Sequence, residues 1–290
     1  WSVGCAGAGR ELVRAGIDAL RASGLSLLNV DLMFGLPGDS AASWLETVEF
    51  ALSLEPDVIT TYDTVYKNRR IAIDAQRRGQ LPEAESFGRL YDAGFERLRS
   101  AGLRARYGSV NFSRAPGRLG TSRYLEGRIL DGLDYVGVGL YASSLMGTTW
   151  LFAPAGLEDW LAAARSGRLA AGDVYALPIE HLMAKYLLLA LSYGFIDPVR
   201  FERRFAEPVE RRFAEALELL SSSGLLASLP PGREDACEGQ AGAPAAAAGA
   251  ETGQVWAMTP GSFSRLPGMR AAFFPDEALA SLRLPVPLPG

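Results

Sequence analysis

The stretch Leu27–Gly38, with the sequence LLNVDLMFGLPG, decides how this chain folds. Its first eight residues form an almost continuous apolar run that only Asn29 and Asp31 interrupt. Such a run is typical of a parallel strand that is covered on both faces. Gly35–Gly38 then breaks the pattern, so the sequence predicts a strand that ends in a tight turn.

Helices are predicted on both sides of this strand. Residues 11–23 place apolar side chains on one helical face and stop at Gly24, and residues 40–54 form a second amphipathic helix with Ser40 as its N-cap. Residues 58–62, VITTY, follow as a second strand. The alternation of helices and strands indicates a β/α parallel sheet or barrel.

The predicted strands stop near residue 150. Before that point we expect a helix over residues 86–100 and strands over 105–112 and 134–140; after it we expect helices over 158–165, 179–193 and 198–222. We therefore predict a domain boundary near residue 150 and a mainly helical second domain over residues 151–290. Within that domain, the Pro/Gly/Ala-rich segment 230–253 is expected to be a flexible insertion.

Composition indicates a globular protein and excludes several other classes. With 48% hydrophobic and 21% charged residues among 290, the chain is long enough to bury a sizeable core. A net charge of −4 without a run of Lys or Arg argues against nucleic-acid binding. The longest apolar stretch, Tyr186–Leu191, is far shorter than a membrane span, and no signal-peptide pattern opens the chain. We therefore expect no membrane association and a cytoplasmic location.

The cysteine and histidine content argues against a metal site built by this chain alone. Cys5 and Cys237 are the two cysteines and form no CxxC pair, and His181 is the single histidine. His181 lies near the start of a predicted helix and is interpreted as a packing or helix-end residue. Because Trp1 begins what reads as the middle of an element, we also expect the chain to be N-terminally incomplete.

Asp31 is the most informative residue for function. An acid inside an apolar parallel strand is costly to bury without a partner, so Asp31 either caps a neighbouring loop or contacts a ligand. The ligand interpretation follows from position, since the carboxyl ends of β/α strands point toward bound molecules. Asn111 and Arg114, at another strand end, are interpreted as turn residues. Gly137–Gly139 and Ser143–Ser144 lack the surrounding motifs of a dinucleotide site or a hydrolase.

Several segments, taken in order, resemble one protein family. Asn29–Gly38 resembles the N-[IVL]-D-L-[IM]-[YF]-G-L-P-x segment of the coproporphyrinogen oxidase and HemW branch of the radical S-adenosylmethionine (SAM) proteins. Residues 56–62 (PDVITTY), 107–117 and 134–139 (DYVGVG) are similar to later segments of that family. The resemblance implies an α/β fold in which residues 1–150 form the C-terminal part of a TIM-type radical SAM β/α barrel, followed by the helical domain.

The resemblance also implies site residues and cofactors. Asp31 matches the family aspartate that contacts bound SAM, and Thr64 and Ser143 align with further positions near SAM. The family uses SAM together with a [4Fe–4S] cluster. It also implies an electron donor such as flavodoxin or ferredoxin and a small-molecule substrate. No catalytic residue is assigned.

This chain departs from the family pattern in ways that leave several functions open. The CxxxCxxC loop that supplies three thiolates to the cluster is absent, so the cluster ligands lie outside this chain and the chain by itself is expected to be inactive. Thr121–Ser122 and Tyr141–Ser144 stand where HemW-type haem chaperones carry histidines. The expected function is SAM-derived radical chemistry on a tetrapyrrole or another small unsaturated molecule. The alternatives are a related SAM-dependent C-methyltransferase or cyclopropanase, and a haem chaperone or cluster-free binding protein.

Overall fold

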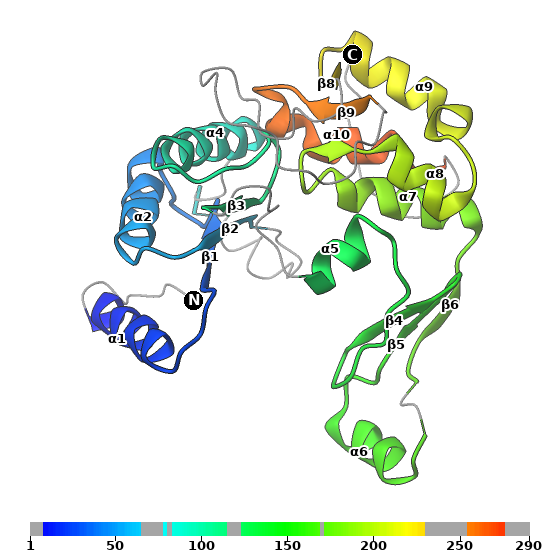
Figure 1. Ribbon diagram of the computed structural model, residues 1–290, viewed down its shortest axis with the longest axis horizontal. Helices are drawn as coiled ribbons and strands as arrows, with labels where there is room; N and C mark the ends of the chain where they lie inside the picture. Colours follow the sequence, from blue (N-terminus) through cyan, green and yellow to red (C-terminus); the bar gives the residue numbers. More distant parts are fainter. Residues whose placement is uncertain are drawn as a thin grey trace. The chain divides into compact units, whose positions relative to one another are not determined.

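The computed structural model describes residues 8–64, 78–79, 83–114, 123–168, 171–229 and 254–275. Its helices and strands, shown in Figure 1, form two compact units. Unit 1 contains the described residues up to 114 together with 258–265, and unit 2 contains the remaining described residues. The predicted insertion at 230–253 lies outside the described residues.

Unit 1 contains a three-stranded sheet. Its strand order is β1 (Asn29–Phe34), β2 (Val58–Asp63) and β3 (Asn111–Ser113). β1 and β2 are parallel, and α2 (Ala41–Ser53) lies between them in the sequence, as the predicted alternation requires. β3 instead runs antiparallel to β2. The strand expected over residues 105–112 is therefore short and differs in direction from a wholly parallel sheet.

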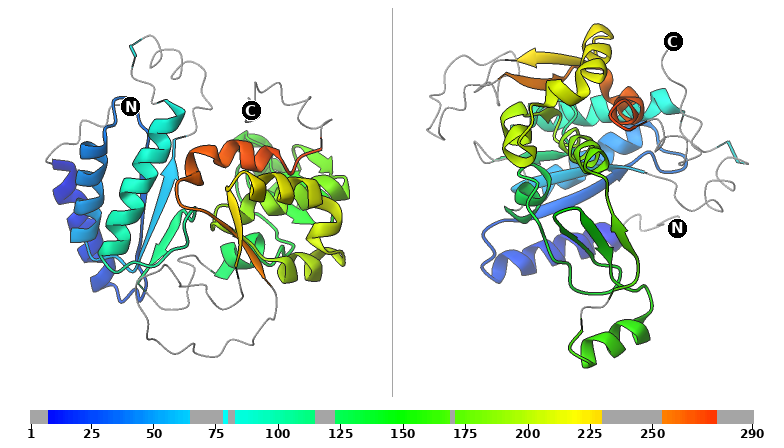
Figure 2. Two further views of the ribbon diagram at one scale, coloured as in Figure 1. Left: turned by 90° about the horizontal axis from the view of Figure 1, so that it is seen from above. Right: turned by 90° about the vertical axis from the view of Figure 1, so that its right-hand side faces the viewer.

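Helices cover one face of this sheet. α2 and α4 (Ala84–Ser100) pack against each other and against β1, and Figure 2 (left) shows them with α1 (Ala8–Ala22) on one side of the strands. The ring centroids of Phe34 in β1 and Trp44 in α2 are 5.3 Å apart, and Ile59 of β2 is fully buried. Burial of these large apolar side chains stabilises the contact between the layers.

The other face of β1 differs from the prediction. Leu32 and Phe34 are buried, whereas Asn29, Asp31 and Met33 are exposed, so the strand alternates between a covered face and an open face. The prediction that β1 is covered on both faces is therefore wrong. Asp31 lies on the face opposite to the one that packs against α2 and α4.

The turn after β1 requires glycine. Gly35 has a φ of 77°, and a Cβ atom at this position would lie 2.1 Å from Cε1 of Phe87 in α4. The next helix is capped as predicted by Ser40. Its hydroxyl accepts from the Ser43 backbone N–H at 3.2 Å, and Ser43 Oγ accepts from the Ser40 N–H at 3.0 Å. The end of β1 and the start of α2 are thus both fixed by local sequence.

Unit 2 combines helices with two small sheets. The first sheet has the order β4 (Ser143–Met146), β5 (Thr149–Phe152), β6 (Val174–Ala176), and the second has the order β7 (Phe195–Ile196), β9 (Val255–Met258), β8 (Leu226–Leu229). The helices are α5 (Arg123–Ile129), α6 (Leu157–Arg165), α7 (Ile179–Ala190), α8 (Pro198–Phe205), α9 (Val209–Ser222) and α10 (Leu266–Ala271). The 3₁₀ turn η1 (Ser262–Arg265) belongs to unit 1 and packs on α4. In the described part of the chain, no helix is both long and apolar enough to cross a membrane.

The beginning of the second unit differs from the sequence prediction. The units change over at residues 121 and 122 and not near 150, because β4 and β5 form a sheet with β6. The buried strand expected over residues 134–140 is not formed. Tyr135 makes an isolated bridge to Leu145, and Val138 is 86% exposed. Unit 2 is therefore a mixture of helices and strands.

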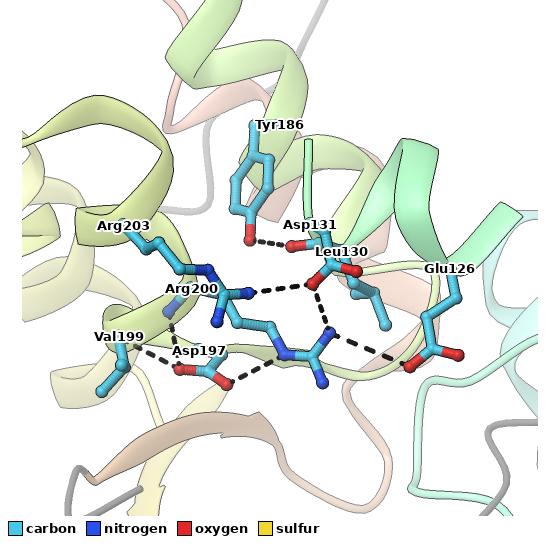
Figure 3. A network of polar contacts seen from close by, with 8 residues as sticks. All are labelled: Glu126, Leu130, Asp131, Tyr186, Asp197, Val199, Arg200 and Arg203. Atoms are coloured by element: carbon cyan, nitrogen blue, oxygen red, sulfur yellow. Dashed lines mark hydrogen bonds and ion pairs between the residues drawn. The ribbon is translucent and has the colours of Figure 1, made fainter. Parts of the chain in front are cut away.

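Ion pairs and hydrogen bonds connect the end of α5 with α8, as Figure 3 shows. Asp131, two residues after α5, accepts hydrogen bonds at Oδ1 from Arg200 Nη1 and Arg203 Nη2, each at 3.0 Å. Arg200 has two further acidic neighbours. The Tyr186 hydroxyl of α7 donates to the Leu130 carbonyl at 2.5 Å. These contacts fix α5 against α7 and α8 within unit 2.

Candidate functional site

A row of hydrogen-bonded polar side chains crosses the open face of the sheet in unit 1. Asn29 Nδ2 donates to Asp31 Oδ1 at 2.8 Å. The Thr60 hydroxyl lies 3.1 Å from Asn29 Oδ1 and 3.1 Å from Asn111 Oδ1. We call these four side chains the polar row. The row extends from β1 through β2 to β3.

The register of the strands explains the polar row. Asp31 pairs with Thr60 in the parallel ladder, and Thr60 pairs with Asn111 in the antiparallel ladder. Paired residues point to the same face, as do residues two apart on one strand, which adds Asn29. Thr60 and Asn111 are buried, whereas Asp31 and Asn29 are exposed. The row is therefore anchored in β2 and β3 and accessible to a ligand at β1.

Tyr62 borders the accessible end of the polar row. It pairs with Met33, two residues beyond Asp31, and is 44% exposed. Its pKa is raised, first by partial burial and second by the negative charge of Asp31. The Tyr62 hydroxyl therefore keeps its proton at neutral pH and offers a hydrogen-bond donor near the carboxylate.

The other two predicted site residues lie in different units. Thr64 follows β2, and its N–H and hydroxyl donate to the Phe34 carbonyl at 3.0 Å and 2.7 Å. Its proton is thus committed to the end of β1, while its oxygen can still accept a hydrogen bond. Ser143 lies in β4 of unit 2, with Oγ 3.3 Å from the Tyr135 hydroxyl. The structure therefore brings Asp31 and Thr64 to one sheet, and it describes Ser143 in a separate unit.

The polar row can hold a polar small molecule by hydrogen bonds. The Asp31 carboxylate can accept from a pair of ribose hydroxyls or from an ammonium group, and Tyr62 can donate. A metal cluster has no comparable set of ligands. No group of three His, Cys, Asp or Glu side chains suited to a metal ion occurs within the described ranges. The two cysteines of the sequence are also fewer than the three thiolates that a radical SAM cluster requires.

Comparison with curated proteins identifies relatives, although no protein-family model matches this chain. The chain is 20% identical over 212 residues to the heme chaperone HemW of Bacillus subtilis, a match covering 72% of this chain and 55% of that protein. It is 26% identical over 226 residues to the oxygen-independent coproporphyrinogen III oxidase of Thermostichus vulcanus, covering 72% of this chain and 69% of the relative. This chain is a homologue of the HemW and oxygen-independent coproporphyrinogen III oxidase proteins.

A solved structure shows the same fold. Coproporphyrinogen III oxidase (HemN) from Escherichia coli, described as a radical SAM enzyme, matches 91% of this chain with a TM-score of 0.62 and 18% sequence identity. The match covers 58% of the HemN chain. The HemN/HemW-like chain likewise spans about half the length of the two HemW proteins that it matches, 55% and 46%. The mixed α/β fold of HemN is therefore present in this chain.

Sequence reasoning identified Asp31 in this HemN/HemW-like chain but not the rest of the polar row. The interpretation of Asn111 as a turn residue is wrong, because Asn111 is buried in β3 and bonded to Thr60. Arg114 contacts the loop before β2, since its Nε donates to the Pro56 carbonyl at 3.0 Å. Thr60 could have been predicted to share a sheet face with Tyr62, because alternate side chains of the strand VITTY point to the same face.

Proposed function

We propose that this HemN/HemW-like chain is part of a radical SAM enzyme that acts on a tetrapyrrole or another small unsaturated molecule. The observation that carries the proposal is the polar row, which ends at the exposed carboxylate of Asp31 on the sheet face that α2 and α4 leave open. Relatives named as oxygen-independent coproporphyrinogen III oxidases support the reaction class.

In this proposal, each residue of the polar row contributes to SAM binding. Asp31 accepts hydrogen bonds from the ribose or amino group of SAM. Asn29 orients that carboxylate through its amide at 2.8 Å, and Thr60 lies within hydrogen-bond distance of Asn29 at 3.1 Å. Tyr62 adds a neutral donor beside them. SAM, when bound and reductively cleaved, supplies the radical that reacts with the substrate.

The remaining elements of the proposal lie outside the polar row. Thr64 offers a hydroxyl oxygen at the carboxyl end of β2, and Ser143 offers a hydroxyl in unit 2. The [4Fe–4S] cluster does not fit this chain alone because two cysteines cannot supply three thiolates. We therefore assign no step through the cluster to these residues. The proposed setting is a partial β/α barrel in a cytoplasmic protein that receives electrons from flavodoxin or ferredoxin.

Equilibrium dialysis of this chain with radiolabelled SAM tests the proposal. We expect saturable binding to one site, because the polar row is formed entirely within unit 1. We also expect no 5′-deoxyadenosine after anaerobic reconstitution with iron and sulfide, since the cluster ligands are missing. Failure of SAM to bind at millimolar concentration would overturn the proposal, and 5′-deoxyadenosine formation by this chain alone would overturn the statement about the cluster.

A haem chaperone is the second candidate, and the similarity to Bacillus subtilis HemW favours it. Titration of the chain with haem, followed through the Soret band, separates the two functions. A stoichiometric haem complex in a chain that binds no SAM would favour the chaperone. If the complete protein consumes SAM, the products separate the remaining alternatives, because methyl transfer releases S-adenosylhomocysteine and radical oxidation releases 5′-deoxyadenosine.

A further inference from the structure

A small basic pocket lies in unit 2, whereas the polar row belongs to unit 1. Its volume is about 20 Å³, room for roughly one water-sized group. Lys185 of α7, Arg128 of α5 and Arg204 of α8 contribute its three cationic side chains. The rest of the lining is mainly apolar and includes Ile129, Leu145, Leu182, Leu189 and Phe205.

Two of the three cations rest on aromatic rings and not on carboxylates. Lys185 Nζ lies 5.0 Å from the ring centroid of Trp150, and Arg128 Cζ lies 4.5 Å from that of Tyr135. Among the residues that the structure describes, neither cation forms an ion pair with an acidic side chain, and Arg128 Nε is buried without a hydrogen-bond partner. Arg204 differs, because its Nη2 contacts Asp134 Oδ1 at 3.3 Å.

This arrangement has an electrostatic cost. Burial first, and then the nearby positive charge of Arg128, lower the pKa of Lys185 to about 8. The aromatic faces of Trp150 and Tyr135 offset part of the cost through cation–π attraction. A bound anion would offset more of it, because it would satisfy both the unpaired charge and the unpaired N–H group.

We propose that Lys185 and Arg128 form a binding site for the carboxylate of an apolar organic acid. One carboxylate oxygen fills the pocket between the two cations, and the apolar part of the acid lies on the surrounding aliphatic and aromatic side chains. A carboxylate suits this site better than a phosphate, because the small pocket accepts one oxygen and the mainly apolar remainder of its lining suits the apolar part of an organic acid better than further charged oxygens. The site belongs to unit 2 and does not depend on the proposed SAM chemistry.

The contacts in Figure 3 explain why the site is preformed. Arg128 is in the last turn of α5, and the next two residues outside that helix, Leu130 and Asp131, are held by Tyr186 and by two arginines of α8. The same α7 that carries Tyr186 carries Lys185 one residue earlier. Arg128 and Lys185 are therefore positioned by α5 and α7, whose relative placement is fixed by these hydrogen bonds.

The lysine content of the chain gives a direct test. Lys185 and Lys67 are its two lysines, so lysine labelled with ¹³C at Cε gives two side-chain signals, and Lys185→Arg assigns them. Titration with benzoate should shift the Lys185 signal to saturation and raise its pKa, while the Lys67 signal stays fixed. Benzamide, which has the same size and no charge, should shift neither signal.

Calorimetry with the two variants completes the test. Lys185→Met should weaken benzoate binding about 10-fold or more, because a charge-assisted hydrogen bond is lost, whereas Lys185→Arg should retain most of the affinity. The proposal is overturned if benzoate leaves the Lys185 signal of the unmodified chain unchanged, or if benzamide shifts it equally. Binding of inorganic phosphate more tightly than benzoate would overturn the assignment to a carboxylate. The signal of the unmodified chain decides the matter even if a variant does not fold.

Discussion

Replacing Asp31 by asparagine separates a ligand contact from a structural role. The substitution keeps the size of the side chain and an oxygen that can accept from Asn29, but it removes the charge. Because Asp31 is exposed, we expect the free energy of unfolding to change by no more than about 0.5 kcal/mol. The melting temperature should then move by no more than about 2 °C. SAM affinity should fall roughly 10- to 100-fold, because hydrogen bonds to a charged group contribute about 1.5–3 kcal/mol.

Asp57→Asn is the matched control for this experiment. Asp57 precedes β2 and accepts at Oδ2 from the Leu28 backbone N–H at 2.8 Å, so it is an acid with a structural contact near the start of the same sheet. Its replacement should lower the melting temperature by about 2–4 °C, which corresponds to about 1 kcal/mol. The SAM affinity of the folded protein should stay unchanged. The opposite pattern, with Asp31→Asn unstable but normal in SAM affinity, would refute the assignment of Asp31.

The Tyr62 hydroxyl gives a second, independent signal for Asp31. The charge of Asp31 contributes to the raised pKa of Tyr62, after the larger effect of burial. Asp31→Asn should therefore lower the pKa of Tyr62 without returning it to the value of a free tyrosine. This shift can be followed by NMR of ¹³Cζ-labelled tyrosine. An unchanged Tyr62 titration would show that the two side chains do not interact in solution.

Three further predictions concern stability. In chemical denaturation, Arg200→Ala should lower the free energy of unfolding by about 1–3 kcal/mol, and Arg203→Ala should lower it by less than about 1 kcal/mol. The reason is burial, because the Arg200 side chain is 22% exposed and the Arg203 side chain 55%. Equal losses of stability in the two variants would contradict this reason. Gly35→Ala should destabilise the chain by about 2–4 kcal/mol, since the added Cβ meets Phe87 at a positive φ, and a melting temperature like that of the unmodified chain would contradict this. The pKa of Lys185 in the folded chain, about 8, is below the ordinary lysine value of 10.5. Between these two pH values the unfolded chain therefore binds more protons than the folded chain, and the contribution of Lys185 to stability rises with pH. The stability of Lys185→Met relative to the unmodified chain should therefore be greater at pH 7 than at pH 10, and a pH-independent difference between the two would contradict it.

The elements of unit 1 were predictable because their signals are local. The helix cap at Ser40, the β-rich residues of β2 and the glycine after β1 each act within a few residues, and each appears in the structure as predicted. The direction of β3 was not predictable in this way. Whether a strand runs parallel or antiparallel depends on a partner far along the chain, and β3 pairs with β2 about 50 positions earlier.

Unit 2 was less predictable because its strands are short. β4 and β5 have four residues each and β7 has two, too few for a two-residue period to stand out. The helix expected over residues 198–222 is two helices, since Ala206 adopts a left-handed conformation and Pro208 cannot continue the helical hydrogen bonds. Proline was the visible signal for that break.

The polar row changes the physical basis for the hypothesis that Asp31 contacts a ligand. A buried acid was expected to need a partner, but Asp31 is exposed, so its charge carries little desolvation cost. The unusual feature is instead that Thr60 and Asn111 are polar and buried in the neighbouring strands, where apolar side chains would stabilise the sheet more. The Thr60 hydroxyl donates its one proton to Asn111 Oδ1 or to Asn29 Oδ1, and the Asn29 amide donates to the Asp31 carboxylate. Polar side chains at three paired positions across three strands are more informative than one acid in one strand, and only the register of the sheet brings them together.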